Sequence, residues 1–166
     1  IKVVFGANVS DFGLKFDVED GFWGVLLISL AIMIPLVFLA SLTEGFSAKY
    51  PFFKVFDGSS YLSGQFVIWQ LLYFAQFFCV EFFFRGFMIQ SLRPSIGFYS
   101  IFVMTIPYCM IHFGKPPAET FAAIAAGVFL GWLSYSSGSI LLGLALHCSV
   151  ALLMDILALY QKKLLF

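Results

Sequence analysis

Only a few polar side chains fall inside the long apolar stretches of this chain, and they are of types that can do chemistry. Glu81 and Arg85 lie four residues apart within a largely apolar run at 77–88. On a helix, positions i and i+4 share one face, so these two charged groups can touch. The other members of the set, each in or beside an apolar run, are His112, His147 and Asp155.

Glu81 and Arg85 have two interpretations. A lone ionised carboxylate in hydrocarbon is costly, so both groups are expected to face protein or water rather than lipid. The first interpretation is a structural ion pair that locks helices together. The second is a reactive carboxylate that the arginine holds in place. His112 and His147 favour the second, because polar groups on three different apolar segments are rare in membranes unless they converge.

Four kinds of chemistry are open to Glu81, His112 and His147. In hydrolysis, a carboxylate in a low-dielectric pocket takes a proton from water, and the histidines orient that water or donate to an oxyanion. In a zinc site, these three ligands leave a fourth position for water, although the HExxH spacing is absent. Proton relay or transport also uses buried carboxylates and histidines. Bis-histidine haem ligation is the fourth.

The composition indicates which solvent surrounds these residues. The chain has 166 residues, of which 61% are hydrophobic and 11% charged, and its mean hydropathy is +0.99. Soluble domains carry about 25% charged residues. An all-α, polytopic transmembrane helix bundle is therefore expected, with membrane lipid around it. The formal net charge is zero and no basic block is present, so nucleic acid is not an expected partner.

Five apolar segments long enough to be spans are predicted, and polar stretches separate them. Residues 1–21 form a polar juxtamembrane segment, with a turn or short interfacial helix near 10–14, and residues 22–163 form a single transmembrane domain. The first residue is Ile1, and further spans are expected to precede it. The predicted spans are 22–42, 62–92, 96–112, 118–133 and 140–160.

Local sequence adds three details to this plan. Pro35 is expected to kink the first span without ending it, and Arg93-Pro94 to end the second. The fourth span carries a face of small residues suited to close helix packing, which comprises Ala122, Ala123, Ala126, Gly127 and Gly131. More Lys and Arg fall on one side of the membrane, which is the expected cytoplasmic side, and they are Lys49, Lys54, Lys115, Lys162 and Lys163.

Three short motifs carry a resemblance to a known family. The segment from Glu81 to Gly86 resembles the first motif of the CAAX protease and bacteriocin-processing (CPBP or Abi) family, which includes the Ras-converting type of prenyl-protein endopeptidase. That motif has two adjacent glutamates, three residues and an arginine. The second motif, an aromatic residue and a histidine four positions later, is similar to Tyr108 and His112. The third begins with a histidine, as at His147.

The chain departs from this family pattern at two positions. Val80 stands where the family has its first glutamate, which is usually assigned to activate water. Ala151 stands where the third motif has an asparagine or aspartate. Asp155 lies one turn further along the same helix face and is a candidate to compensate. The resemblance covers about 62–160.

The resemblance implies a membrane-embedded endopeptidase that hydrolyses a peptide bond near the membrane surface. Glu81 would be the general base for water, His112 would help to hold that water or balance the carboxylate, and His147 would donate to the oxyanion. Arg85 would orient Glu81, and Tyr108 and Asp155 would support the site. This mechanism requires no cofactor, and no metal is assigned.

The implied substrate is a peptide or a lipidated protein, and the implied location is the cell membrane of a bacterium. Because Val80 and Ala151 depart from the motifs, a second hypothesis stands beside the first. In it the chain is a catalytically inactive family member that acts as a membrane scaffold or a bacteriocin immunity protein.

Overall fold

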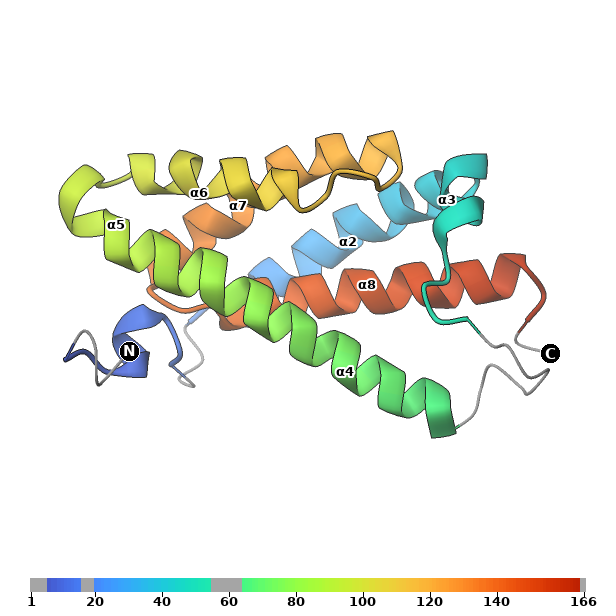
Figure 1. Cartoon of the computed structure of the whole chain (residues 1–166), viewed down its shortest axis with the longest axis horizontal. Helices are drawn as coiled ribbons and strands as arrows, with labels where there is room; N and C mark the ends of the chain where they lie inside the picture. The colour runs from blue at the N-terminus through green and yellow to red at the C-terminus, as the bar shows by residue number, and fades with distance from the viewer. Residues whose placement is uncertain (1–5, 16–19, 55–63, 165–166) are drawn as a thin grey trace.

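The computed structural model of the chain describes residues 6–15, 20–54 and 64–164, and within these ranges every regular element is a helix (Figure 1). The elements before the site are the 3₁₀-helix η1 (Val9–Phe12), α2 (Phe22–Ser41) and the short α3 (Glu44–Lys49). Those that follow are α4 (Gly64–Glu81), the π-helix η2 (Phe82–Met88), α5 (Ile89–Ile96), α6 (Tyr99–Met110), α7 (Pro117–Ser137) and α8 (Leu141–Gln161).

The predicted all-α transmembrane bundle is confirmed. Within the described residues, four helices are apolar and long enough to cross a membrane: α2, the continuous helix Gly64–Ile96, α7 and α8. The shorter apolar α6 brings the count to roughly five, as predicted. The division into a juxtamembrane segment and a transmembrane domain stays a prediction, and residues 1–5 and 16–19 lie outside the described ranges.

Several predicted boundaries were wrong by a few residues. The second long helix continues through Pro94 to Ile96, because a proline in a last turn forfeits only one backbone hydrogen bond. α6 has 12 residues, about 18 Å at 1.5 Å per residue, and it ends at Met110, so His112 lies in the turn that follows. α7 continues to Ser137, where Gly138 in the left-handed conformation ends it.

Small residues bring α6 and α7 into close contact, as the sequence predicted. Ala123, Gly127 and Gly131 are buried, and a Cβ at Gly127 would lie 2.8 Å from Thr105 Cγ2. Ala122, by contrast, is exposed. The buried stripe therefore runs at every fourth residue of α7 and aligns α6 beside it.

An N-terminal element covers one end of the bundle. η1 is a short helix at the place where a turn or short interfacial helix was predicted, and its Phe12 ring stacks on Phe87 with centroids 5.6 Å apart. A Cβ at Gly86 would collide with the Phe12 carbonyl, so only glycine allows the backbones of η1 and η2 to approach this closely. The Ile140 N–H donates to the Gly13 carbonyl at 2.9 Å, which joins this segment to the start of α8.

Candidate active site

Glu81 and His147 meet where α4 lies against α8. Glu81 is the last residue of α4, and its Oε1 is 2.8 Å from His147 Nδ1 and 3.1 Å from Arg85 Nη1. The side chains of Glu81 and Arg85 have no exposed area, whereas that of His147 is 16% exposed. Two of the predicted catalytic residues, with the predicted arginine, therefore form one buried charged group.

The contact with Glu81 selects a tautomer of His147. An ionised carboxylate can only accept hydrogen bonds, so His147 Nδ1 carries the proton and donates it to Glu81. In the neutral ring, Nε2 then holds a lone pair. The Phe77 ring packs against the imidazole with centroids 4.3 Å apart, which limits the ring's movement.

Gly143 makes room for the second carboxylate oxygen. A Cβ at this position would lie 2.8 Å from Glu81 Oε2. This oxygen is buried and has no hydrogen-bond partner among the described residues. Gly143 precedes His147 by one helical turn, so α8 supplies both the partner of Oε1 and the space for Oε2.

Tyr108 lies at the centre of the remaining contacts. The Arg85 guanidinium carbon is 3.7 Å from the centroid of the Tyr108 ring, a cation–π contact inside the protein. The same ring packs against His112 with centroids 4.7 Å apart and lies 6.4 Å from the His147 ring. Tyr108 therefore joins the Glu81–Arg85–His147 group to His112.

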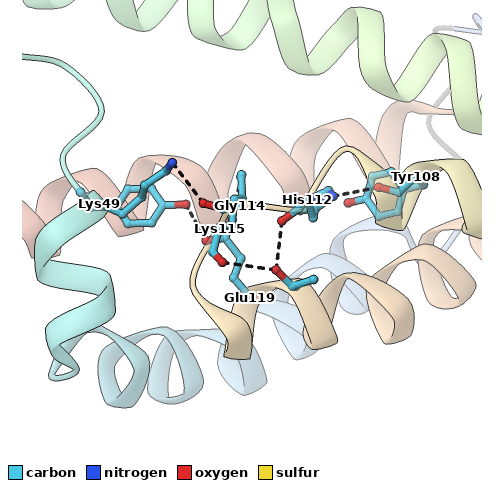
Figure 2. A network of polar contacts seen from close by, with 8 residues as sticks. Lys49, Tyr108, His112, Gly114, Lys115 and Glu119 are labelled. Carbon is cyan, nitrogen blue, oxygen red and sulfur yellow. Dashed lines mark hydrogen bonds and ion pairs between the residues drawn. The ribbon is translucent and has the colours of Figure 1, made fainter.

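His112 reaches this group from a turn rather than from a helix. Its Nδ1 is 2.9 Å from the Tyr108 carbonyl oxygen, and its side chain is directed at Tyr108 (Figure 2). A carbonyl only accepts, so Nδ1 is the protonated nitrogen and Nε2 carries the lone pair in the neutral ring. Both histidines thus share the same tautomer.

A π-helix immediately follows Glu81, and it carries Arg85. π-helical turns are rare and occur frequently at functional sites. η2 spans Phe82–Met88 and buries Phe84, Arg85 and Gly86. No pattern in the sequence signalled this segment. Gly143 is a small residue one turn before His147 on the same helix face, which is the one sequence feature that could have drawn attention to it.

Asp155 lies in a separate layer of the bundle. It follows His147 by two turns of α8 and is within electrostatic reach of the Tyr50 and Tyr73 hydroxyls. The Phe77 ring lies between the two layers, 4.5 Å from the Tyr73 ring and 4.3 Å from the His147 ring. The predicted support of the site by Asp155 stays a prediction.

The two positions that depart from the family motifs are apolar and packed. Val80 packs against the core cluster that contains Phe84 and Tyr108. Ala151 is 6% exposed on α8. Within residues 6–15, 20–54 and 64–164, no three His, Cys, Asp or Glu side chains come together in a way that could hold a metal ion.

Comparison with known proteins identifies the family. The family described as type II CAAX prenyl endopeptidase Rce1-like matches residues 62–153, which is more than half of the chain. The chain belongs to this Rce1-like family. The match contains Glu81, His112 and His147 and leaves out η1, α2 and α3. No curated protein and no solved structure matches the chain.

Membership in the Rce1-like family is consistent with the long apolar helices of this chain. The Rce1-like family is a protease family of the membrane, which agrees with the long apolar helices of this chain. The chain is therefore an integral membrane protein of an endopeptidase family. The predicted resemblance to this family is confirmed.

Proposed function

We propose that the chain is an intramembrane endopeptidase in which Glu81 and His147 together activate water. The observation that carries this proposal is the 2.8 Å contact between Glu81 Oε1 and His147 Nδ1. A carboxylate that accepts from one imidazole nitrogen leaves the other nitrogen as a base. The same contact stabilises the imidazolium that forms when that nitrogen takes a proton.

The burial of the two groups supports a division of labour. The resemblance to the family assigned the base directly to Glu81, but its side chain is fully enclosed, whereas His147 retains exposed area. Water therefore reaches His147 Nε2 more readily than the carboxylate. In this scheme His147 takes the proton from water, and Glu81 holds the ring and its tautomer. The protonated His147 then returns the proton to the departing amine.

His112 and Arg85 have supporting roles in the proposal. His112 Nε2, with its lone pair, can accept a hydrogen bond from the attacking water and orient it. Arg85 faces Glu81 and the Tyr108 ring, so it pairs with the carboxylate and holds it in place rather than touching substrate. The substrate is proposed to be a peptide or prenylated protein that reaches the site from the membrane surface.

The direct test is a cleavage assay on the full chain in lipid vesicles. The substrates are a fluorogenic peptide with a farnesylated CAAX end and the same peptide without the lipid. Glu81→Gln and His147→Ala are each expected to lower kcat/KM by about 100-fold or more, the scale of general acid–base catalysis. Cys148→Ala, beside His147, is the matched control and is expected to keep its rate.

A second candidate function has its own observation. Val80 and Ala151 are packed apolar residues where the family motifs carry polar groups, which favours a catalytically inactive scaffold or bacteriocin immunity protein. If folded wild-type chain cleaves neither peptide, this second candidate replaces the first. If the chain cleaves peptide and Glu81→Gln retains that activity, the family assignment stands but the proposed water-activating pair is wrong.

A further inference from the structure

The loop that carries His112 depends on contacts made outside α6. His112 lies in the turn at 111–114 between α6 and α7. Its N–H donates to the Cys109 carbonyl at 3.0 Å, and its own carbonyl accepts from the Thr120 hydroxyl at 3.0 Å and from the Lys115 N–H at 3.2 Å. The bond from Thr120 ties the histidine to the first turn of α7 (Figure 2).

Glu119 connects this first turn to α3. Its Oε1 is 2.6 Å from Lys115 Nζ, and its Oε2 accepts from the Tyr50 hydroxyl at 2.7 Å. Its place in the first turn of α7 favours the negative charge, because the N-terminal end of a helix dipole is positive. One carboxylate thereby joins the loop that carries His112 to the residue that ends α3.

Tyr50 is a rigid anchor for this connection. The residue is 2% exposed, and its ring packs on Phe46 and Phe52 with centroids 4.7 and 4.6 Å away. Burial, and after it the charge of Glu119, raises the pKa of Tyr50 well above its ordinary value, so the phenol stays protonated and can donate. Lys49 Nζ adds a second contact from α3, to the Gly114 carbonyl at 3.3 Å.

We propose that α3, through the Tyr50–Glu119 hydrogen bond, is a positioning element for His112. The segment that contains α3 lies outside the part of the chain that matches the family, yet it holds the turn in which His112 reaches Tyr108. Tyr50 and Glu119 are positioning residues, because they act through His112. The catalytic part of this inference rests on the proposed peptidase function, whereas the positioning of the loop does not.

Two variants distinguish the contribution of the Tyr50 hydroxyl from that of the Glu119 charge. Tyr50→Phe keeps the aromatic packing and removes the donor to Glu119. Glu119→Gln keeps an acceptor oxygen for Tyr50 and removes the charge beside Lys115. It therefore preserves the hydrogen bond that Tyr50→Phe removes. Ser41→Ala is the matched control, because it removes a hydrogen bond of 2.6 Å from the Gln161 amide to the buried Ser41 hydroxyl, a bond that involves neither Tyr50 nor Glu119.

The first measurement is hydrogen exchange of the full chain in lipid nanodiscs. Tyr50→Phe is expected to speed exchange of the amides at 112–115 about fivefold, the scale of one lost hydrogen bond, and to leave the amides of α8 unchanged. Glu119→Gln is expected to give a smaller increase in the same amides. Ser41→Ala is expected to leave them unchanged. Equal exchange at 112–115 in wild type and Tyr50→Phe overturns the proposal.

The second measurement is cleavage kinetics on the same proteins. Tyr50→Phe is expected to lower kcat about fivefold with KM within about twofold, because the change misplaces His112 without removing a substrate contact. Faster exchange with an unchanged kcat overturns the catalytic part and leaves α3 as a structural clamp. If wild type shows no cleavage at all, the proposed function fails, and the exchange data alone then decide whether α3 positions the loop.

Discussion

At the scale of single residues, the site depends on a glycine, Gly143, because it has no side chain to fill the space beside Glu81. Gly143 leaves the space into which Glu81 Oε2 projects. Gly143→Ala is expected to push the carboxylate away from His147 and lower kcat/KM at least tenfold, with a loss of about 1–3 kcal/mol in stability from overpacking. Cleavage assays and unfolding in detergent measure the two effects.

The control for this variant is Gly24→Ala, which adds the same methyl group to α2 where a Cβ meets nothing within 4 Å. That change is expected to be neutral or slightly stabilising, since alanine favours a helix more than glycine does. An active and stable Gly143→Ala protein would mean that Glu81 is not confined by α8.

Arg85 tests the energetics of the buried pair. Its guanidinium faces Glu81 and the Tyr108 ring with no exposed area. Arg85→Gln removes the cationic partner of the buried carboxylate, which then keeps only its hydrogen bond from His147, and is expected to cost about 3–5 kcal/mol in the free energy of unfolding. Arg85→Lys keeps the charge and loses the planar stacking, so it is expected to cost less. Equal losses, measured by unfolding in detergent, would show that stacking rather than charge holds Arg85.

At the scale of helices, the contact between α6 and α7 sets the position of Tyr108. A Cβ at Gly127 would lie 2.8 Å from Thr105 Cγ2 and 3.1 Å from Tyr108 Cδ1. Gly127→Ala is therefore expected to displace Tyr108 and lower kcat more than fivefold, because small misplacements of catalytic groups are costly. Ala122→Val, on the exposed side of α7, is the control and is expected to keep its rate.

Asp155 and His147 lie in separate layers along α8, and this separation allows a test of whether Asp155 supports the site. The Phe77 and Tyr73 rings lie between this residue and His147. If the layers act separately, Asp155→Asn keeps kcat within about threefold, as for substitutions away from a site. A larger fall in kcat, with stability unchanged, would support the role in the site that the resemblance implies.

At the scale of the whole molecule, the lysines mark the two ends of the bundle. Lys49 contacts Gly114 at the end of the bundle where α3 lies and α8 ends. At the opposite end, the Lys15 carbonyl accepts a hydrogen bond from Ser139 (Figure 1). The end rich in lysine is expected to face the cytoplasm.

This orientation is testable with single cysteines in a chain whose three native cysteines are replaced. In sealed right-side-out vesicles, an impermeant maleimide is expected to label Lys15→Cys and to label Lys162→Cys only after permeabilisation. The reverse order of labelling would invert the topology.

The sequence alone determined the long apolar helices, apart from some of their ends, and the candidate residues. Hydropathy is a local property, so α2 and α8 were predicted to within a residue or two, and the small residues of α7 revealed its packing face. Glu81, His112 and His147 stood out because polar groups in apolar helices are costly unless they have partners. The resemblance to family motifs then predicted that they share one site.

Only the tertiary structure decided which partners they have. The bond between Glu81 and His147 joins residues 66 positions apart, and no local pattern encodes such a distance. The π-helix after Glu81, the turn that holds His112 and the contact of Tyr50 with Glu119 likewise arise where packed helices meet. Side-chain partners depend on the relative placement of whole helices, which is set by the sum of many weak packing contacts rather than by nearby sequence.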